Sequence, residues 1–177
     1  QRKSLISIQR NIRYQLNLID ELQVYSKLDL QPLSIKPTAT DLIFLLNDVS
    51  EYALILCSKQ NNRFHRKIPE RVPKLINLDG NRLKQVLLNL LSNAAKFTRD
   101  GVVTLSVTLE PEDKGSALHL AVSDTGIGIE LPPNIDISDD FQQTQVASES
   151  TGLGLVIAQR ILSAMGSTLR VSSTLGQ

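Results

Sequence analysis

The chain has 177 residues, of which 41% are hydrophobic and 21% charged, and its formal net charge is +1. These proportions are ordinary for a globular protein, and the length suits one compact domain with an extension. The small net charge gives no electrostatic basis for binding nucleic acid. The single cysteine, Cys57, excludes a disulfide within the chain, and no Cys/His pattern indicates a metal site. We expect Cys57 to be a small core residue of a helix.

The N-terminal part predicts a long helix over about residues 3–29. Its inward positions recur at alternating steps of three and four, as in a coiled coil. A helix with one such seam is not stable alone and needs partner helices. A helix folded back onto its own domain is the alternative. The residues of this seam are Leu5, Ile8, Ile12, Gln15, Ile19, Leu22 and Ser26.

The rest of the chain alternates between helical and extended patterns, with turn residues between them. The helix that starts near Asp41 has an apolar face, and the strand at 102–109 has apolar residues at every second position. This order predicts an α/β sandwich in which one mixed sheet carries helices on one face. The predicted helices are 41–59, 79–97 and 152–165, and the predicted strands are 33–36, 64–68, 74–78, 102–109, 116–124 and 168–173.

The predicted helix 79–97 carries a polar row beside its apolar stripe. Asn89, Asn93 and Lys96 lie roughly a third of a turn from the stripe at 100° per residue. Amide oxygens suit a hard cation such as Mg²⁺, and an ammonium group suits phosphate. The alternative is that both asparagines cap or bridge neighbouring loops.

Asp124 ends a predicted strand and begins the segment Asp124-Thr-Gly126-Ile-Gly128. Alternation places its carboxylate on the apolar face of the strand, so we expect it near the core. A desolvated carboxylate needs donors, and the exocyclic amine of a purine is a suitable one. Gly126 and Gly128 allow the backbone to turn tightly against a planar ligand. An ordinary turn at the end of a strand is the alternative.

Glycines also open the last predicted helix, in Ser150-Thr-Gly152-Leu153-Gly154-Leu. Backbone N–H groups at a helix start face outward and attract anions. Taken alone, this pattern favours a plain joint between a loop and a helix.

In this order, the three segments resemble the ATP-binding domain of sensor histidine kinases, in the superfamily that also holds gyrase B, Hsp90 and MutL. Asn89-Leu-Leu-Ser-Asn93-Ala-Ala-Lys96-Phe97 is similar to the N box of that family. Asp124-Thr-Gly-Ile-Gly and Gly152-Leu-Gly-Leu are similar to its two glycine boxes. Hydrolysing relatives have a glutamate base at the position of Asn89, and an amide cannot take a proton. The resemblance therefore favours the kinase branch over the ATPase branches.

The resemblance implies roles for the residues in these motifs, with ATP and Mg²⁺ as the bound groups. Asn89 and Asn93 would hold Mg²⁺, and Lys96 would approach a phosphate. Phe97 would lie against the adenine, and Asp124 would accept from its amino group. The residues implied to line the base pocket or to present backbone to the phosphates are Gly126, Gly128, Gly152, Leu153 and Gly154.

The resemblance also divides the chain. Residues 1–30 are similar to the second helix of the kinase dimerisation domain, and residues 31–177 to the catalytic domain, apart from an expected final strand. The γ-phosphate would pass to a histidine outside this chain and then to a response-regulator aspartate. We expect His65 and His119 to be surface residues rather than acceptors. A homodimer through the N-terminal helix is expected, with a heterodimer as the alternative, in the cytoplasmic part of a membrane-anchored bacterial protein.

The segment that corresponds to the ATP lid departs from the family pattern. It is short, contains no lysine or arginine, and has Ser150 at a usual glycine position. A lost charge-assisted contact to phosphate costs about 1.5–3 kcal/mol, or roughly 10- to 100-fold in affinity. The alternative function is therefore a weakly active, kinase-like regulator that pairs with another kinase. The acidic residues of the lid are Glu130, Asp136, Asp139, Asp140 and Glu149.

Overall fold

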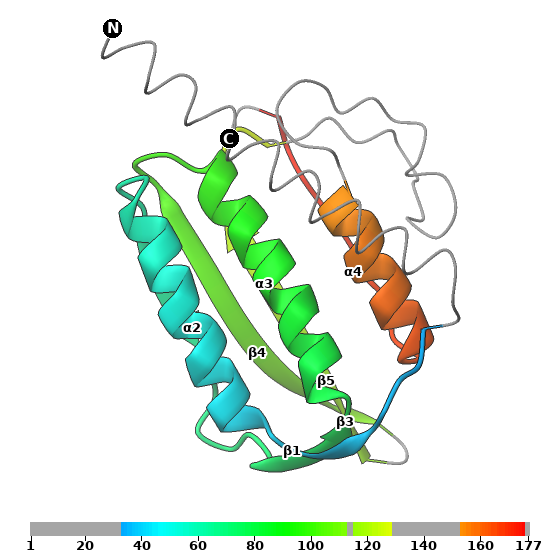
Figure 1. Cartoon of the computed structure of the whole chain (residues 1–177). Coiled ribbons are helices and arrows are strands. Elements are labelled where there is room, and N and C mark those ends of the chain that lie inside the picture. Colours follow the sequence, from blue (N-terminus) through cyan, green and yellow to red (C-terminus); the bar gives the residue numbers. More distant parts are fainter. Residues whose placement is uncertain (1–32, 113–114, 129–152, 176–177) are drawn as a thin grey trace, which may run out of the picture.

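The computed structural model describes residues 33–112, 115–128 and 153–175 (Figure 1). The predicted dimerisation helix, the lid and Gly152 lie outside these residues, and so does the predicted domain boundary after residue 30. Their structure and roles stay predictions. In the part of the chain that is described, no helix is long and apolar enough to cross a membrane.

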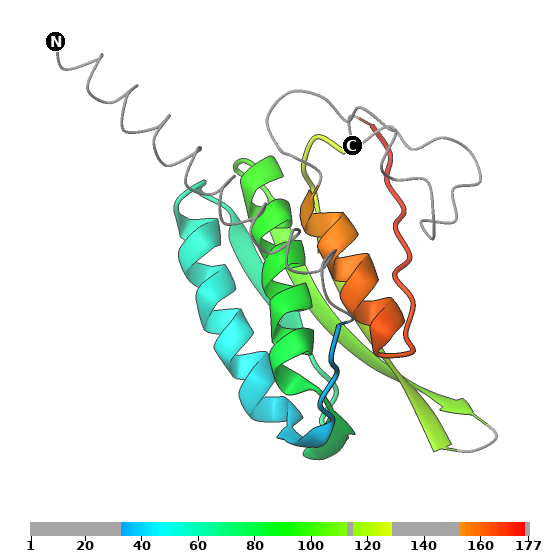
Figure 2. The same cartoon turned by 45° about the vertical axis from the view of Figure 1, so that its right-hand side comes forward.

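The described elements form two layers, with three helices side by side on one face of a twisted sheet (Figures 1 and 2). The sheet has the order β2-β4-β5, in which β2 is parallel to β4 and β4 is antiparallel to β5. The predicted mixed sheet with helices on one face is therefore confirmed. The helices are α2 (Leu42–Ser58), α3 (Gly80–Phe97) and α4 (Leu153–Ala164), and the strands of this sheet are β2 (Arg63–Lys67), β4 (Val102–Glu112) and β5 (Gly115–Asp124).

A separate two-stranded ladder lies where α2 and α3 begin. Strand β1 (Thr38–Asp41) pairs antiparallel with β3 (Leu75–Leu78). The predicted strand at 33–36 is wrong, because the strand starts only after Pro37. The backbone N–H of Lys36 donates instead to Asp79 Oδ2, at 2.9 Å, and so serves the start of α3.

The main core lies between α2, α3 and the inner face of β4. The helical and alternating patterns of the sequence placed its residues correctly, since α2 and β4 bury the expected positions. Cys57 is also buried as predicted, and burial raises the pKa of its thiol. The buried residues of this cluster are Leu42, Leu45, Leu46, Val49, Ala53, Cys57, Leu83, Leu87, Leu91, Ala94, Ala95, Val103, Leu105 and Val107.

Helix α4 packs against the opposite flank of α3 through a second, smaller cluster. Its buried members in the described chain are Val86, Ile157, Ala158 and Ile161. Gly166 follows the helix with a φ of +73°, and the N–H of Ser167 bonds back to the carbonyl of Leu162 at 2.8 Å. These contacts end α4 in the left-handed turn that glycine favours.

The predicted strand at 168–173 is wrong, because this segment forms no ladder with another described strand. Its alternating pattern reflects side-chain packing instead. Leu169 packs against the cluster under α4, and Val171 is half-buried. An alternating segment becomes a strand only when a neighbouring backbone pairs with it.

Candidate functional site

The start of α3 is fixed by Asp79, whose side chain accepts from the N–H of Arg82 at 3.1 Å and from Lys36 N–H. Asp79 is only 8% exposed. Burial works against its charged form and raises the pKa. The hydrogen bonds from Lys36, Arg82 and Asn81 and the Arg82 charge outweigh this, so the pKa of Asp79 is lowered. This cap fixes the residue at which α3 begins.

The polar row of α3 faces partly toward α4. Asn89 and Asn93 are half-buried and lie one turn apart on the same side of the helix. A Cβ added to Gly154, in the first turn of α4, would lie 3.2 Å from Asn93 Nδ2. The side chain of Asn93 therefore lies directly against the backbone that opens α4.

The end of α3 carries Lys96 and Phe97. Lys96 is exposed, and its Nζ lies 5.1 Å from the centre of the half-buried Phe97 ring. At this distance the ammonium is attracted to the face of the ring. The positive charge is thus held beside the aromatic side chain.

Asp124 lies at the end of β5, where two groups donate to the same carboxylate oxygen. Thr98 Oγ1 donates to Asp124 Oδ1 at 3.2 Å, and the N–H of Gly126 donates to it at 2.8 Å. Asp124 is exposed, so its expected position near the core is wrong. It is the last residue of β5, and even the apolar row before it is only half-buried.

The turn after Asp124 packs tightly against the end of α3. A Cβ added to Gly126 would lie 2.5 Å from the carbonyl oxygen of Phe97, so only glycine fits there. The next N–H, that of Ile127, donates to the same carbonyl at 3.3 Å. Gly128 follows with a φ of +69°, and its backbone lies against Thr174.

The predicted site residues therefore gather around the C-terminal half of α3. Asn93 lies against Gly154 on one side, and Phe97 lies against Gly126 on the other. Leu153 opens α4 next to Gly154. Lys96 and Asn89 lie on the same helix, and Asp124 and Gly128 flank Gly126.

Two residues outside the sequence motifs hold this arrangement. Thr98 is 1% exposed and carries the hydroxyl that bonds to Asp124. Asn62 is 8% exposed and donates to the carbonyl of Thr98 at 2.7 Å. The only indication of this role in the sequence is that Asn62 is a polar residue shortly before a predicted strand.

The donor set can be compared with the chemistry of a divalent cation. Among the described residues, no group of three or more His, Cys, Asp or Glu could hold a metal ion. Asn89 and Asn93 offer neutral amide oxygens, which are hard ligands that Mg²⁺ accepts alongside phosphate oxygens and water. The residues present thus fit a Mg²⁺ ion that arrives with a polyphosphate.

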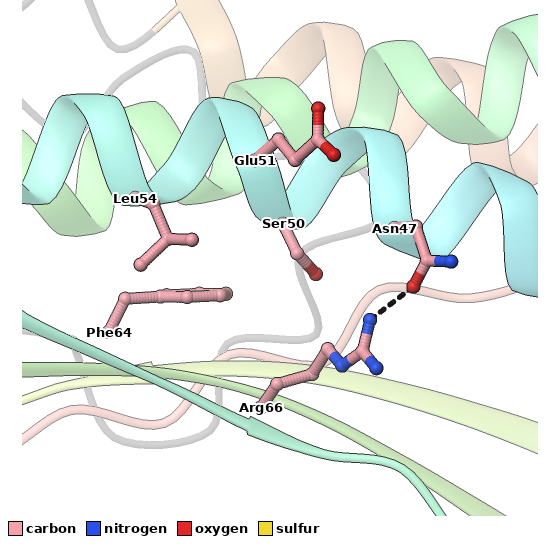
Figure 3. A pocket seen from close by; sticks show the side chains of 6 residues that line it. All are labelled: Asn47, Ser50, Glu51, Leu54, Phe64 and Arg66. Atoms are coloured by element: carbon pink, nitrogen blue, oxygen red, sulfur yellow. Dashed lines mark hydrogen bonds between the residues drawn. The ribbon is translucent and has the colours of Figure 1, made fainter.

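A cavity of about 360 Å³ lies elsewhere, between α2 and β2 (Figure 3). The guanidinium of Arg66 points toward Asn47 and donates to its Oδ1. None of the predicted site residues lines this cavity. Its lining residues are Asn47, Ser50, Glu51, Leu54, Phe64 and Arg66.

Both histidines are exposed on strands, as the sequence predicted. His65 lies on β2, and His119 lies on β5 with its Nε2 3.2 Å from Glu110 Oε2. Neither is part of the arrangement around α3.

Comparisons with known proteins identify the family of the chain. Residues 78–177, more than half of the chain, match the family model described as histidine kinase-, DNA gyrase B-, and HSP90-like ATPase. The chain is 32% identical over its whole length to hybrid signal transduction histidine kinase A of Dictyostelium discoideum, but covers only 9% of that protein. Over 97% of its length it is 32% identical to the sensor histidine kinase GacS of Pseudomonas protegens, of which it covers 19%.

A solved structure agrees with these sequence matches. The crystal structure of full-length ShkA in complex with AMPPNP matches all of this chain with a TM-score of 0.77 and 28% identity. The chain covers 36% of that structure, and much less of the curated relatives. The chain therefore belongs to the histidine kinase-, DNA gyrase B-, and HSP90-like ATPase family and is a histidine kinase ATP-binding catalytic domain.

Proposed function

We propose that this chain binds Mg-ATP and serves as the catalytic part of a sensor histidine kinase in two-component signalling. The observation that carries the proposal is the position of Asn93. Its amide lies against Gly154 at the start of α4. Phe97 follows one helical turn later in α3 and lies against the turn after Asp124. An aromatic ring, an acceptor, an ammonium group and amides therefore surround one end of α3.

The base of ATP would lie at the Asp124 end of this site. The carboxylate would accept from the amino group of adenine, and the Phe97 ring would lie against the base. Gly126 and Gly128 keep the turn free of side chains, so the ligand can approach the backbone.

The triphosphate would lie between α3 and the start of α4. Asn93, with Asn89, would hold Mg²⁺ through amide oxygens. The Lys96 ammonium would neutralise phosphate charge, and the N–H groups near Leu153 and Gly154 would face the anion. When bound, Mg²⁺ supplies neutralisation of the negative charge on the phosphates. Gly152 is proposed for the same backbone contact.

The reaction would be a phosphoryl transfer to a histidine outside this chain. The bond between the γ-phosphorus and the bridging oxygen of ATP breaks, a bond from a histidine nitrogen to that phosphorus forms, and ADP leaves. The attacking nitrogen is the one that carries no proton, and the proton on the other ring nitrogen passes to solvent. Positioning and charge neutralisation carry such a transfer, so no base is required in this domain.

Further partners follow from the same proposal. The phosphoryl group would pass from the histidine to an aspartate of a response regulator or receiver domain. The chain would dimerise through its N-terminal helix, as part of a protein whose membrane anchor lies elsewhere and whose catalytic region is cytoplasmic. The domain division at residue 30 belongs to this proposal.

A second function is favoured by the composition of the lid. Residues 129–152 contain five carboxylates and no lysine or arginine. Such a lid repels a triphosphate, which favours a kinase-like regulator with weak catalysis that acts by pairing with another kinase. The two functions differ in whether the site around Asn93 and Asp124 binds nucleotide.

Calorimetric titration of the chain with AMPPNP, with and without Mg²⁺, tests the proposal. We expect Mg²⁺-dependent binding in the micromolar range, which corresponds to about −8 kcal/mol. Asn93→Ala and Asp124→Ala should each weaken it at least about tenfold. The matched controls are Asn77→Ala on β3 and Asp48→Ala on α2, because both side chains lie outside the site.

The outcomes separate the functions. Binding that survives in both site variants would contradict the proposed site. No binding at millimolar AMPPNP would favour the regulator. Steady phosphate release from ATP by the chain alone would instead indicate a hydrolase.

A further inference from the structure

Thr98 is placed to control how Asp124 presents its carboxylate. The Thr98 hydroxyl and the N–H of Gly126 both donate to Oδ1, at 3.2 Å and 2.8 Å. Among the described residues, no donor reaches Oδ2. Two donors on one oxygen restrain rotation of the carboxylate, so the second oxygen is presented in a fixed direction.

Thr98 is itself held from a distant part of the chain. Its N–H bonds to the carbonyl of Ala94 at 3.1 Å, and its carbonyl accepts from Asn62 Nδ2 at 2.7 Å. The same amide of Asn62 donates to the carbonyl of Ala95 at 3.1 Å and accepts from the N–H of Gly101 at 3.0 Å. One buried side chain thus ties the turn before β2 to the end of α3.

The two turns also meet through their backbones. Asn61 and Asp100 have positive φ values of 59° and 54°, and Asn61 Nδ2 donates to Asp100 Oδ1 at 2.6 Å. The N–H of Asp100 bonds to the carbonyl of Gln60 at 3.2 Å. The N–H of Arg63 bonds to the carbonyl of Gly101 at 2.8 Å. Thr98 therefore lies next to two turns, residues 60–62 and 99–101, that are joined to each other by hydrogen bonds.

We propose that Thr98, held by Asn62, is a positioning residue that makes the purine subsite selective for a 6-amino group by fixing the carboxylate of Asp124. The inference rests on the proposed nucleotide binding. A fixed Oδ2 accepts from a 6-amino group, whereas a purine without that group offers it no donor, and a 6-oxo group opposes it with a second acceptor. Without the Thr98 hydroxyl the carboxylate turns more freely, and part of this discrimination is lost.

The test compares Thr98→Val with Thr98→Ser in the 177-residue chain. Valine keeps the shape of threonine but has no donor, whereas serine keeps the hydroxyl. Dissociation constants are measured by calorimetry, with Mg²⁺, for ATP and for purine riboside triphosphate, which lacks the 6-amino group. Thermal unfolding shows whether each variant is folded.

We expect Thr98→Val to weaken ATP binding about fivefold to tenfold and to leave binding of the analogue within about twofold. The ratio of the two constants should therefore fall in Thr98→Val and stay near the wild-type value in Thr98→Ser. A general loss of structure would weaken both ligands alike, so the ratio isolates the positioning role. Asn62→Asp, which keeps the acceptor but loses the donors, should lower the ratio in the same direction.

The inference and the proposed function fail in different ways. If the wild-type chain binds ATP more tightly than the analogue and Thr98→Val keeps that ratio, the inference is overturned and nucleotide binding stands. An unselective wild-type chain has the same consequence. If the wild-type chain binds neither ligand, the proposed function is overturned and the inference with it.

Discussion

Gly154 lies so close to Asn93 that a Cβ on residue 154 would be 3.2 Å from Asn93 Nδ2. Gly154→Ala should therefore displace the Asn93 amide by a few tenths of an ångström. We expect Mg²⁺-dependent binding of AMPPNP to weaken about threefold to tenfold, because Asn93, the proposed Mg²⁺ ligand, moves. Calorimetric titration measures the change.

The stability of the same variant separates this effect from unfolding. Alanine favours a helix over glycine by about 1 kcal/mol, so urea unfolding of Gly154→Ala should show unchanged or higher stability. Ser163→Ala, at an exposed position of the same helix, is the control and should leave affinity unchanged. A loss of affinity that only parallels a loss of stability would contradict the explanation.

Gly128 and Gly166 form a matched pair for separating backbone strain from a steric clash. Both have positive φ, +69° and +73°. A Cβ on Gly128 would lie 2.2 Å from the carbonyl oxygen of Thr174, whereas a Cβ on Gly166 would meet nothing within 4 Å. Gly166→Ala should cost about 1 kcal/mol, and Gly128→Ala at least about 1 kcal/mol more. Urea unfolding of both variants measures these losses of stability. Equal losses would show that the backbone at Thr174 shifts without cost and that the clash does not matter.

Asp79 gives the stability of the chain a component that depends on pH. Its pKa is lowered in the folded state, so its contribution is complete above the ordinary carboxyl pKa of about 4. The contribution is lost as pH falls through the lower folded value. Asp79→Asn carries no charge and keeps only one acceptor oxygen for the N–H groups of Lys36 and Arg82. We expect it to cost about 1–3 kcal/mol at pH 7.

Urea unfolding between pH 7 and pH 3 tests the Asp79 prediction. The stability difference between the wild type and Asp79→Asn should be constant down to about pH 5 and shrink below pH 4. Glu51→Gln, at an exposed position of α2, is the control. A difference that grows toward low pH would contradict the lowered pKa.

Asn62 makes three hydrogen bonds from a buried position, so its removal should be costly. Asn62→Ala leaves the carbonyls of Ala95 and Thr98 and the N–H of Gly101 without their partner. We expect a loss of about 2–4 kcal/mol in the free energy of unfolding. The neighbouring Asn61→Gly loses one exposed bond to Asp100 but relieves a positive φ, so it should stay within about 0.5 kcal/mol. A similar cost for both variants would contradict this account.

The sequence predicted the helices and their buried faces because periodicity reports which side of an element faces a core. The apolar positions of α2 and β4 are buried as expected. The segment at 168–173 was assigned wrongly for the same reason, since alternation cannot tell whether a second backbone pairs with the segment. The predicted strand at 33–36 does not form, because the N–H of Lys36 bonds to Asp79, and the strand observed nearby is β1 at 38–41.

The residues of the candidate site were predicted from motifs, but Asn62 and Thr98, which hold them in place, were not. Nothing in the spacing of Asn62 and Thr98 says that an amide reaches across 36 residues to a carbonyl. The exposure of Asp124 was also not predicted. Alternation shows which face of a strand a residue lies on, but not whether the helices cover that face as far as the end of the strand. Long-range hydrogen bonds and the ends of elements depend on the assembled fold.

The separate packing of α4 has a consequence for local unfolding. In the described chain, α4 is anchored by a cluster of four buried residues, apart from the larger core under α2 and α3. Amide protons of α4 should thus exchange with deuterium faster than those of α3, since opening α4 exposes less apolar surface. If nucleotide contacts both α3 and α4, its addition should slow exchange in α4 more than in α2. The bound ligand would then stabilise the helix that the protein core holds least.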